Sequence, residues 1–315
     1  MDLLSTVLQT AAVTGSVAAT VRAGGSWGLE LAEVPGAAFH AITSGTVHLA
    51  VQGERPLILT AGDAVLLPRG TPHKVRSDPG TPTRPFDHVR AETALGEGGE
   101  LHLGSSPAST QIICASYSQD QTTRLSPFSA LPTVLYVPAL SAPPGLRNSL
   151  ALIADELASA GPGLRSVLDH AINIVLVQLL RAWIAGDEDR TPSWLQGLAN
   201  PTTCAAMTAF HQNPAHPWTV ASLARSVGVS RATLVRRFQS ELGQSPADYI
   251  TSWRMDLAAS RLRLGNETLD SVAHAVGYQS EYSFNRAFAR RYGSPPGRYR
   301  ARARVAESLL RRSAV

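Results

Sequence analysis

A pattern that occurs twice constrains this chain more than any other feature of its sequence. Residues 223–238 read LARSVGVSRATLVRRF, and residues 272–288, about fifty positions later, read VAHAVGYQSEYSFNRAF. Both stretches begin with an apolar residue and Ala, reach Val-Gly, continue through a short polar turn, and end in a segment with Arg and Phe. Self-similarity of this kind predicts two copies of one supersecondary unit.

In each copy the pattern predicts a short helix, a tight turn and a second helix. Gly228 and Gly277 stand at the start of the turn, where glycine supplies the positive φ that a helix C-terminus commonly needs. Ala224 and Ala273 are small where two helices must cross closely. The expected buried residues are Val227, Leu234 and Phe238 in the first copy and Val276, Phe284 and Phe288 in the second. This is the pattern of a helix-turn-helix motif, although one copy alone could be an ordinary helical hairpin.

The residues around the two copies predict a wholly helical C-terminal domain over 193–305. Asn200 and Pro201 are a cap and a first-turn proline, and they open a helix that reaches about Gln212. Further helices are expected at 219–227, 230–242, 245–264, 269–276 and 281–292, which places the two motifs at about 219–242 and 268–292. SPPGRY (294–299) is expected to end the domain, with a basic tail after it.

Charge is distributed unevenly along the chain. Residues 1–199 contain 12 Lys and Arg against 17 Asp and Glu, whereas residues 200–315 contain 16 against 7. A basic half indicates nucleic acid as a partner, although on charge alone a solvated basic face explains it equally well. The repeat favours DNA, because the helix expected between the two motifs is about 27 Å long. A rigid spacer of that length can place two recognition helices in successive major grooves, about 34 Å apart.

Residues 200–300 resemble the DNA-binding domain of the AraC/XylS family of bacterial transcription regulators. The resemblance rests on PWTVASLARSVGVSRATLVRRF, SPADYITSWRMDLAASRLRL and LDSVAHAVGYQSEYSFNRAFARRYGSPPGRYR, in the family's order and spacing. It implies a protein that is not an enzyme and that binds double-stranded promoter DNA in concert with RNA polymerase.

The resemblance also implies residues that face the bases. They are Ala232, Val235 and Arg236, with Arg231 nearby, in the first motif, and Glu281, Tyr282 and Arg286, beside Asn285, in the second. Arg236 and Arg286 are candidates for bidentate contacts to guanine, with a phosphate contact as the alternative for either. Ala232 and Val235 are small and apolar and could touch a thymine methyl group, but the first motif could also read fewer bases.

Other residues of the motifs are expected to position the protein on DNA. Ser230 and Ser280 are expected to cap the recognition helices, with Ser230 also near phosphate. Arg237, Arg290 and Arg291 are expected to neutralise backbone phosphates.

The N-terminal part of the chain predicts an all-β domain, a barrel or a sandwich, over residues 1–145. Between residues 15 and 140, short apolar runs with two-residue alternation are broken by Gly and Pro. Residues 81–100 are polar and Gly-rich and predict a long loop, and APPG (142–145) closes the domain.

FHAITSGTVHLAVQGERPLILTAGDAVLLPRGTPHKV (39–75) resembles half of a cupin barrel, and AGDAVLLPRGTPH within it resembles the second cupin motif. Joined to the helical domain, it resembles the cupin-type sensor domain of one AraC-like subfamily. The chain departs from enzymatic cupins, because His40 and His48 do not form a His-x-His pair and no Glu follows at the usual interval.

A reduced set of metal ligands remains, and the resemblance points to His40, His73 and Cys114. Two imidazoles and a thiolate suit Zn²⁺ or a softer metal, with His88 or His102 as a fourth ligand from the long loop. The alternative is that both histidines are hydrogen-bonded barrel residues and Cys114 is a small buried apolar residue. His48 is expected on a strand surface.

A helical segment over 146–192 is expected to link the two domains. Residues 166–185 carry a broad apolar stripe, which could pack on the barrel or form a homodimer, and GDEDRTP (186–192) predicts an inter-domain linker. No apolar run approaches the length that spans a bilayer, and the N-terminus lacks a basic segment typical of signal peptides. Two cysteines, Cys114 and Cys204, provide no disulfide framework and favour a cytoplasmic location.

The function we expect is transcriptional regulation controlled by a small-molecule, metal or oxidant signal that the cupin domain senses. A cupin enzyme with an accessory helical domain is the first alternative, and its incomplete metal set counts against it. A DNA-repair or structural DNA-binding protein is the second. The two cysteines count against it because they are far apart and lack the Cys-x-x-Cys spacing of a metal cluster.

Overall fold

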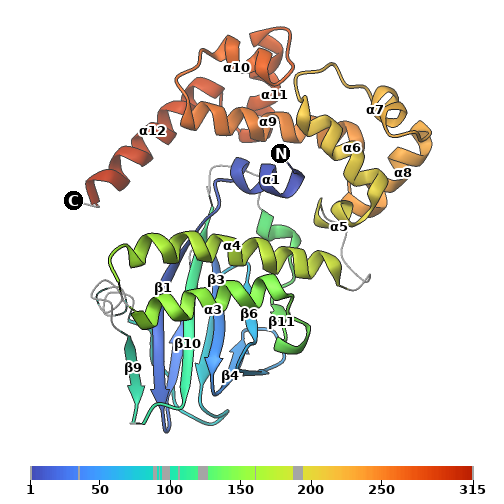
Figure 1. The fold of residues 1–315 in the computed structure, drawn as a ribbon. Helices are drawn as coiled ribbons and strands as arrows, with labels where there is room; N and C mark the ends of the chain where they lie inside the picture. The colour runs from blue at the N-terminus through green and yellow to red at the C-terminus, as the bar shows by residue number, and fades with distance from the viewer. Residues whose placement is uncertain are drawn as a thin grey trace. The chain divides into compact units, whose positions relative to one another are not determined.

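The computed structural model describes residues 2–34, 36–87, 91, 93, 100–105, 107–119, 127–159, 161–186 and 194–313. They form two compact units (Figure 1). The β-rich unit comprises Thr14–Gln119 and Leu131–Asp187, and the helical unit comprises Met1–Val13, Asp120–Ala130 and Glu188–Val315. Half of the predicted loop over 81–100 lies outside this description, and its described half contains the short strand β8 (Arg84–Pro85). Of the predicted linker over 186–192, the description includes Gly186 alone.

Two sheets build the β-rich unit. The larger contains β1 (Thr14–Gly24), β3 (Ala37–Ser44), β6 (Ala64–Leu67), β9 (Leu101–Gly104), β10 (Thr110–Ser118) and β11 (Leu135–Val137), in the order β11-β6-β3-β10-β1-β9. The smaller contains β2 (Gly28–Leu31), β4 (Thr46–Val51), β5 (Leu57–Thr60), β7 (His73–Arg76) and β8 (Arg84–Pro85), in the order β5-β4-β7-β2-β8. Two-residue alternation places one apolar set from each strand in a shared core, which includes Val21, Leu29, Ile42, Leu49 and Ile112. The predicted all-β fold is confirmed.

Register in the larger sheet decides which side chains meet inside the barrel. β3 and β10 are antiparallel neighbours, and His40 lies directly opposite Cys114. Successive side chains of a strand point to opposite faces, so both of these point inward while their neighbours Phe39 and Ala115 point outward. His73 belongs to β7 of the other sheet, opposite Leu31 and Val51.

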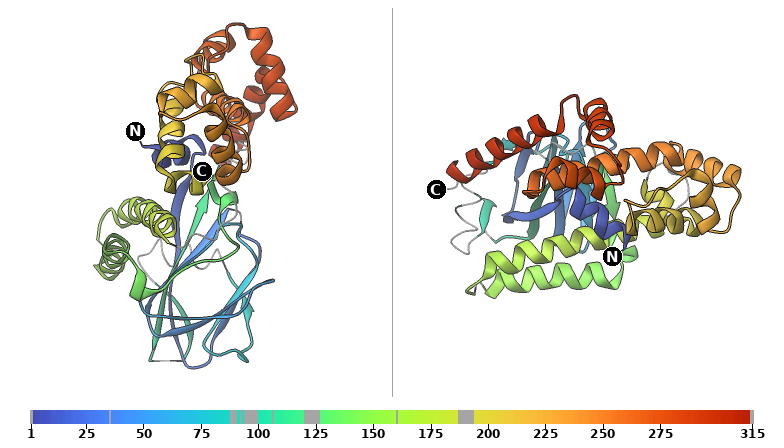
Figure 2. Two further views of the ribbon diagram at one scale, coloured as in Figure 1. Left: turned by 90° about the vertical axis from the view of Figure 1, so that its right-hand side faces the viewer. Right: turned by 90° about the horizontal axis from the view of Figure 1, so that it is seen from above.

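Two helices, α3 (Pro144–Ser159) and α4 (Leu164–Ala185), lie along one face of the larger sheet (Figure 2). Tyr117 of β10 donates its hydroxyl to the Ile172 carbonyl at 2.8 Å, and the Gly15 amide donates to Asn173 Oδ1 at 2.9 Å. By length and mean hydropathy α4 could span a membrane, but 39% of its apolar window is buried in this packing. A core helix of a folded domain meets the same criterion.

The helical unit contains both predicted motifs. Its elements are α5 (Trp194–Ala199), α6 (Pro201–Gln212), α7 (Val220–Ser226), α8 (Arg231–Leu242), α9 (Pro246–Leu264), α10 (Leu269–Ala275) and α11 (Glu281–Tyr292). The glycines of the two turns have positive φ, +69° at Gly228 and +83° at Gly277. Two hydrophobic cores, one under each motif, share α9: Trp253 packs in the first and Met255 in the second. The boundaries of α6 to α11 confirm the sequence-based ones to within two residues.

Three α-helices of the described residues were not predicted, and they are α5, α1 and α12. α1 (Leu3–Thr10) packs Leu3 and Val7 into the core of the first motif, with Met207 and Phe210 of α6. α12 (Pro296–Ser313) replaces the expected basic tail. It forms because Pro296 suits a first helical turn and because Tyr299 and Ala303, four residues apart, are both buried.

Candidate DNA-binding surface and barrel site

The two recognition helices have the same start. Ser230 precedes α8 and accepts a hydrogen bond from the Thr233 amide at 3.1 Å, and Ser280 precedes α11 and accepts one from the Ser283 amide at 3.3 Å. Both caps were expected from the sequence, because serine satisfies amides that the first helical turn leaves free.

One stripe of α8 faces solvent. Ala232, Val235, Arg236 and Gln239 recur at the three- and four-residue spacing of one helix face, and all four are exposed. With Arg231 and Ser240 they line a shallow hollow whose floor is apolar. Gln239 was not singled out from the sequence, although its position seven residues after Ala232 was a usable signal.

The corresponding stripe of α11 has larger side chains. Tyr282 is 72% exposed, and the Arg286 guanidinium lies 5.9 Å from the centre of its ring. Glu281 is exposed on the first turn. Asn285 is partly buried, and its Oδ1 has no hydrogen-bond partner within the described residues. Because this oxygen is itself buried, the Asn285 side chain must turn before it can accept a hydrogen bond from a base.

The arginines expected at phosphates separate into two groups. Arg231 and Arg290 are exposed. Arg237 donates to Asn200 Oδ1 at 2.7 Å, which ties α8 to the start of α6. Arg291 forms a bidentate ion pair with the buried Asp256, at 2.8 and 2.7 Å. The expectation that Arg291 neutralises phosphate is therefore corrected, since releasing it would leave a buried carboxylate unpaired.

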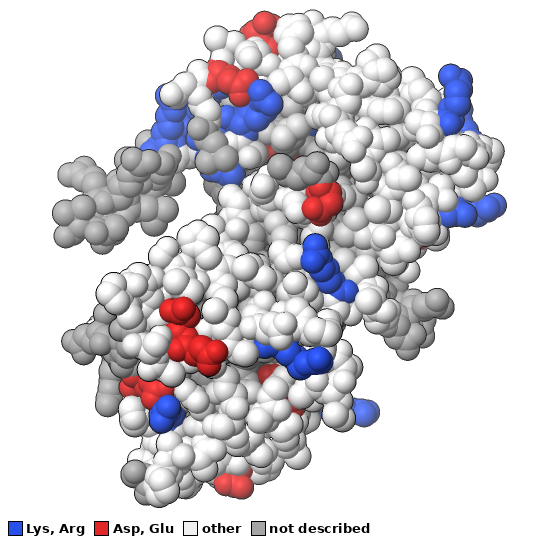
Figure 3. Space-filling model, in the orientation of Figure 1, with Lys and Arg blue, Asp and Glu red and all other residues white. Residues whose placement is uncertain are grey.

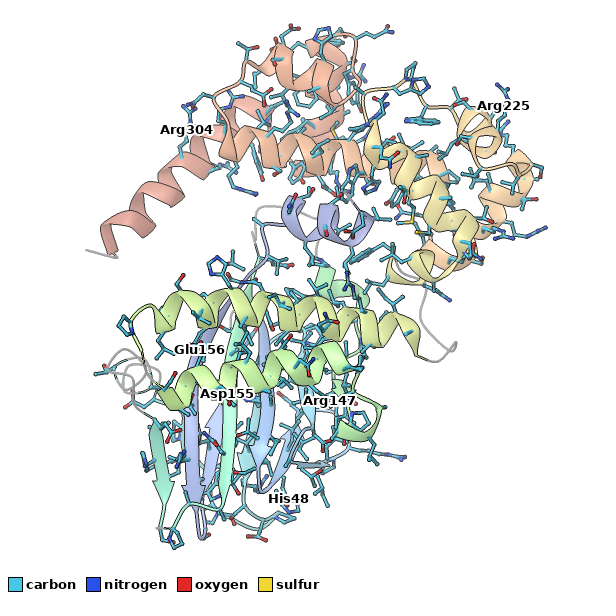
Figure 4. All side chains as sticks on the ribbon, viewed as in Figure 1. His48, Arg147, Asp155, Glu156, Arg225 and Arg304 are labelled. Atoms are coloured by element: carbon cyan, nitrogen blue, oxygen red, sulfur yellow. The ribbon has the colours of Figure 1, made fainter. Side chains whose placement is uncertain are left out.

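Basic side chains of the helical unit are visible on its surface (Figure 3). Figure 4 identifies Arg225 on α7 and Arg304 on α12 among them. Arg304 donates to Asn266 Oδ1 at 2.7 Å. Exposed cations of this kind attract a polyanion whatever its sequence, as a DNA-binding domain requires.

Inside the barrel, three side chains form one hydrogen-bonded chain. Cys114 Sγ lies 3.2 Å from His40 Nδ1, and His40 Nε2 lies 2.8 Å from His73 Nε2. His73 Nδ1 lies 2.8 Å from the Thr71 carbonyl oxygen. The histidines are each 2% exposed and the cysteine is 5% exposed. The structure thus brings together the three candidate residues of the sequence analysis, two from the larger sheet and His73 from the smaller one.

The Thr71 carbonyl fixes every proton in this chain. A carbonyl only accepts, so His73 Nδ1–H donates to it and His73 Nε2 is left as an acceptor. His40 Nε2–H then donates to His73, and the Cys114 thiol donates to His40 Nδ1. Burial supports this neutral state, because it lowers the pKa of both imidazoles and raises the pKa of the Cys114 thiol to about 12.

The donor set suits zinc, but this arrangement does not form a zinc cage. Cys114 and His73 contact opposite nitrogens of the same His40 ring, so the three donors do not point to one position. Two imidazole nitrogens on one tetrahedral zinc would lie about 3.3 Å apart, farther than the 2.8 Å seen here. Among the described residues, no group of three His, Cys, Asp or Glu side chains is placed to hold a metal ion.

The other histidines do not complete the set. His102 lies on β9, exposed, with Nδ1 on the Glu100 carbonyl oxygen, so its assignment to a loop that supplies a ligand is corrected. His48 alternates with inward-facing Val47 and Leu49 and lies on the outer face, as expected. His88 falls outside the described residues. His73 lines an open hollow of about 620 Å³, where Glu30 and Lys74 form an ion pair at 3.2 Å.

Two family models match the chain. One, described as Cupin, matches residues 2–185, and the other, described as Helix-turn-helix domain, matches residues 223–302.

Similar proteins span nearly the whole chain. A putative AraC-like transcription regulator of Streptomyces lividans is 36% identical over 95% of this chain and 98% of its own length. The HTH-type transcriptional regulator AlkR of Acinetobacter baylyi is 29% identical over 95% and 99% of the two chains. The RCS-specific HTH-type transcriptional activator RclR of Escherichia coli is 28% identical over 96% and 99%. A solved AraC-type DNA-binding regulator from Chromobacterium violaceum is 26% identical over 33% of this chain and 92% of that one, with a TM-score of 0.31.

Proposed function

The chain belongs to the family of AraC-type transcriptional regulators with an N-terminal cupin domain, and from this premise we propose that its barrel receives a signal that changes promoter binding. It is a DNA-binding regulator and not an enzyme. The alternatives of a cupin enzyme and of a repair protein are therefore set aside. The finer question is where the signal acts and what class of agent carries it.

The observation that supports a signal site is the buried Cys114–His40–His73 chain. It crosses an otherwise apolar core between the two sheets, where polar groups are retained only at a cost unless they are paired. An agent that removes the Cys114 thiol proton or binds a ring nitrogen of either histidine breaks this hydrogen-bonded chain. On the outward face of the same strand, Tyr117 bonds to α4, so a shift of β10 also moves a helix.

The signal in this proposal is a small molecule, a metal ion or an oxidant. A metal such as Zn²⁺ matches the chemistry of the three donors but requires His40 to turn before all three can bind it. An oxidant requires the Cys114 thiol to lose its proton first, since the thiolate is the reactive form.

The test uses the full chain and an operator selected from random DNA duplexes. We expect the Kd for this operator to change when Zn²⁺, hydrogen peroxide or a small-molecule effector is added. His40→Ala should abolish the change, whereas His48→Ala, a histidine on the outer face, should preserve it. A His40→Ala protein that responds like the wild type would show that the signal acts elsewhere.

Metal content separates the metal form of the proposal from the others. Mass spectrometry of protein purified without chelator should find about one equivalent of zinc, lost in a His40→Ala/His73→Ala variant, if the metal form is correct. A metal-free wild type would direct the search to oxidants and organic effectors.

Three features of the cellular setting are part of the same proposal. The protein acts in the cytoplasm, where promoter DNA is, and it acts there with RNA polymerase. It works as a homodimer through the α3–α4 hairpin, where Leu152 and Ile174 are exposed apolar side chains.

A further inference from the structure

The two recognition helices present different surfaces to DNA. At equivalent positions after the cap, α8 has Ala232, Val235 and Gln239 where α11 has Tyr282, Asn285 and Ala289. Both helices carry an arginine at the remaining position of the stripe, Arg236 and Arg286. The exposed face of α8 therefore has small apolar side chains at two positions where α11 has the larger, polar side chains Tyr282 and Asn285.

The apolar part of the hollow on α8, called the notch below, has the chemistry to contact a methyl group. Ala232 and Val235 line it, and Val235 is 37% exposed although it is apolar. Among base edges in the major groove, thymine alone presents a methyl group. Small floor residues also allow the helix axis to approach the bases more closely than a large aromatic side chain would.

That closer approach brings the next turn of the helix within reach of bases. Ala232 and Gln239 are seven residues apart, which is about 10 Å along the axis. This covers about three base-pair steps of 3.4 Å. The Arg236 and Gln239 side chains are exposed and form no hydrogen bond or ion pair with other described residues, so they are available to DNA. Gln239 can pair with N6 and N7 of adenine, and Arg236 with O6 and N7 of guanine.

We infer that the first motif reads a thymine through the Ala232–Val235 notch and an adenine through Gln239, which makes Gln239 a specificity-determining residue. This inference rests on the proposed DNA-binding function. The base contacts of the first motif thus extend about one helical turn beyond the position that Arg236 and Arg286 share. The corresponding Ala289 of α11 has no group that could make such a contact.

Base analogues test each contact in the selected operator. Replacing the thymine with deoxyuridine removes only its methyl group and should weaken binding about fourfold, the value of burying one such group. Replacing the adenine with 7-deazaadenine should weaken binding of the wild type about tenfold. The same replacement should leave the affinity of the Gln239→Ala protein unchanged. Gln239→Ala should also lose the adenine preference when motifs are selected afresh. Gln212→Ala, which removes an exposed glutamine at the end of α6, should keep it.

The outcomes separate this inference from the function on which it rests. If neither the wild type nor the Gln239→Ala protein selects a specific motif, sequence-specific DNA binding fails, and the inference fails with it. If these two proteins select the same motif and both retain the adenine, DNA binding stands and the role of Gln239 is refuted. If deoxyuridine has no effect at any thymine of the first half-site, the notch is refuted. Both exposed substitutions should fold normally, which circular dichroism checks.

Discussion

At Gly277 the backbone has a φ of +83°, and a Cβ there would lie 2.7 Å from Arg254 and 3.0 Å from the Ala215 carbonyl oxygen. Gly228, at the same place in the first motif, has a φ of +69° but nothing within 4 Å. Gly277→Ala should therefore cost more stability than Gly228→Ala, for which we expect about 1 kcal/mol from the backbone alone. Urea denaturation of the two variants gives the comparison, and equal losses would show that Arg254 moves away freely.

His211 provides a second prediction at the scale of one residue. Its ring packs against Trp253 with ring centres 3.8 Å apart and a 37° angle between the planes, and its Nε2 lies 2.7 Å from the Tyr249 hydroxyl. Burial lowers its pKa from 6.5 to about 3. The unfolded chain therefore gains a proton as pH falls below 6.5, and the folded protein does not gain it until about pH 3. Stability must fall with pH across that window.

His211→Gln should remove this part of the acid sensitivity. Between pH 7 and pH 5 the wild type should lose about 2 kcal/mol more of its free energy of unfolding than the variant does. His40 and His73 have lowered pKa values of the same sign, but they are present in both proteins and cancel in the difference. Parallel stability curves for the two proteins would contradict the prediction.

Arg286 and Arg290 are one turn apart on α11 and should act differently on DNA. Arg286 lies on the same exposed stripe as Tyr282, and Arg286→Ala should relax specificity at one base pair and cost roughly 1–3 kcal/mol. Arg290→Ala should weaken binding to all sequences alike and flatten the salt dependence. Binding titrations at several salt concentrations distinguish them, and uniform losses from both would refute the division of roles.

At the scale of elements, α1 is distant in sequence from the core in which it packs. Leu3 is 3% exposed and Val7 is 1% exposed, among side chains of α6 and α9. Residue 14 then begins β1 of the other unit. The DNA-binding unit is therefore completed by residues that precede the barrel in the sequence.

Val7→Ala should lower the stability of the helical unit by about 1–3 kcal/mol, because two buried methyl groups are lost. Gln9→Ala, on the exposed side of the same helix, should leave it within about 0.5 kcal/mol. Denaturant unfolding of the full chain measures both. If Val7→Ala were as mild as Gln9→Ala, α1 would contribute nothing to this core.

At the scale of the whole molecule, the α3–α4 hairpin has an exposed apolar face. Leu152 is 44% exposed and Ile174 is 49% exposed. Figure 4 shows Arg147 near one end of α3 and Asp155 and Glu156 toward the other. A second copy packed antiparallel would place Arg147 against the opposite charge of its partner, as a two-fold interface requires.

Ile174→Asp should therefore shift the protein from dimer to monomer, measured by sedimentation equilibrium. Ile58→Asp is the matched control, since Ile58 is 62% exposed on β5 of the smaller sheet. The proposed interface is wrong if both variants have the same mass as the wild type.

Much of the helical unit could be predicted because its signals are local. Ser230, Ser280, Gly228 and Gly277 mark helix ends through hydrogen bonds and φ values that involve only a few neighbouring residues. α12 was missed because the Pro-Pro-Gly sequence at its start (295–297) is typical of segments that end a helix. Only the burial of Tyr299 against α9 decides that a new helix forms there.

The sequence by itself determined the two motifs, their spacing along α9 and the exposed polar ends of α8 and α11, because helix geometry converts residue spacing directly into position. Its resemblance to cupins also pointed to His40, His73 and Cys114 as candidate metal ligands. Only the tertiary structure decided that these three form a linear chain in which His40 lies between the other two, since this depends on the register of β3 against β10 and on the approach of β7. The same holds for α1, whose partners lie about two hundred residues away. Packing between distant segments depends on the whole fold, so no local pattern in the sequence records it.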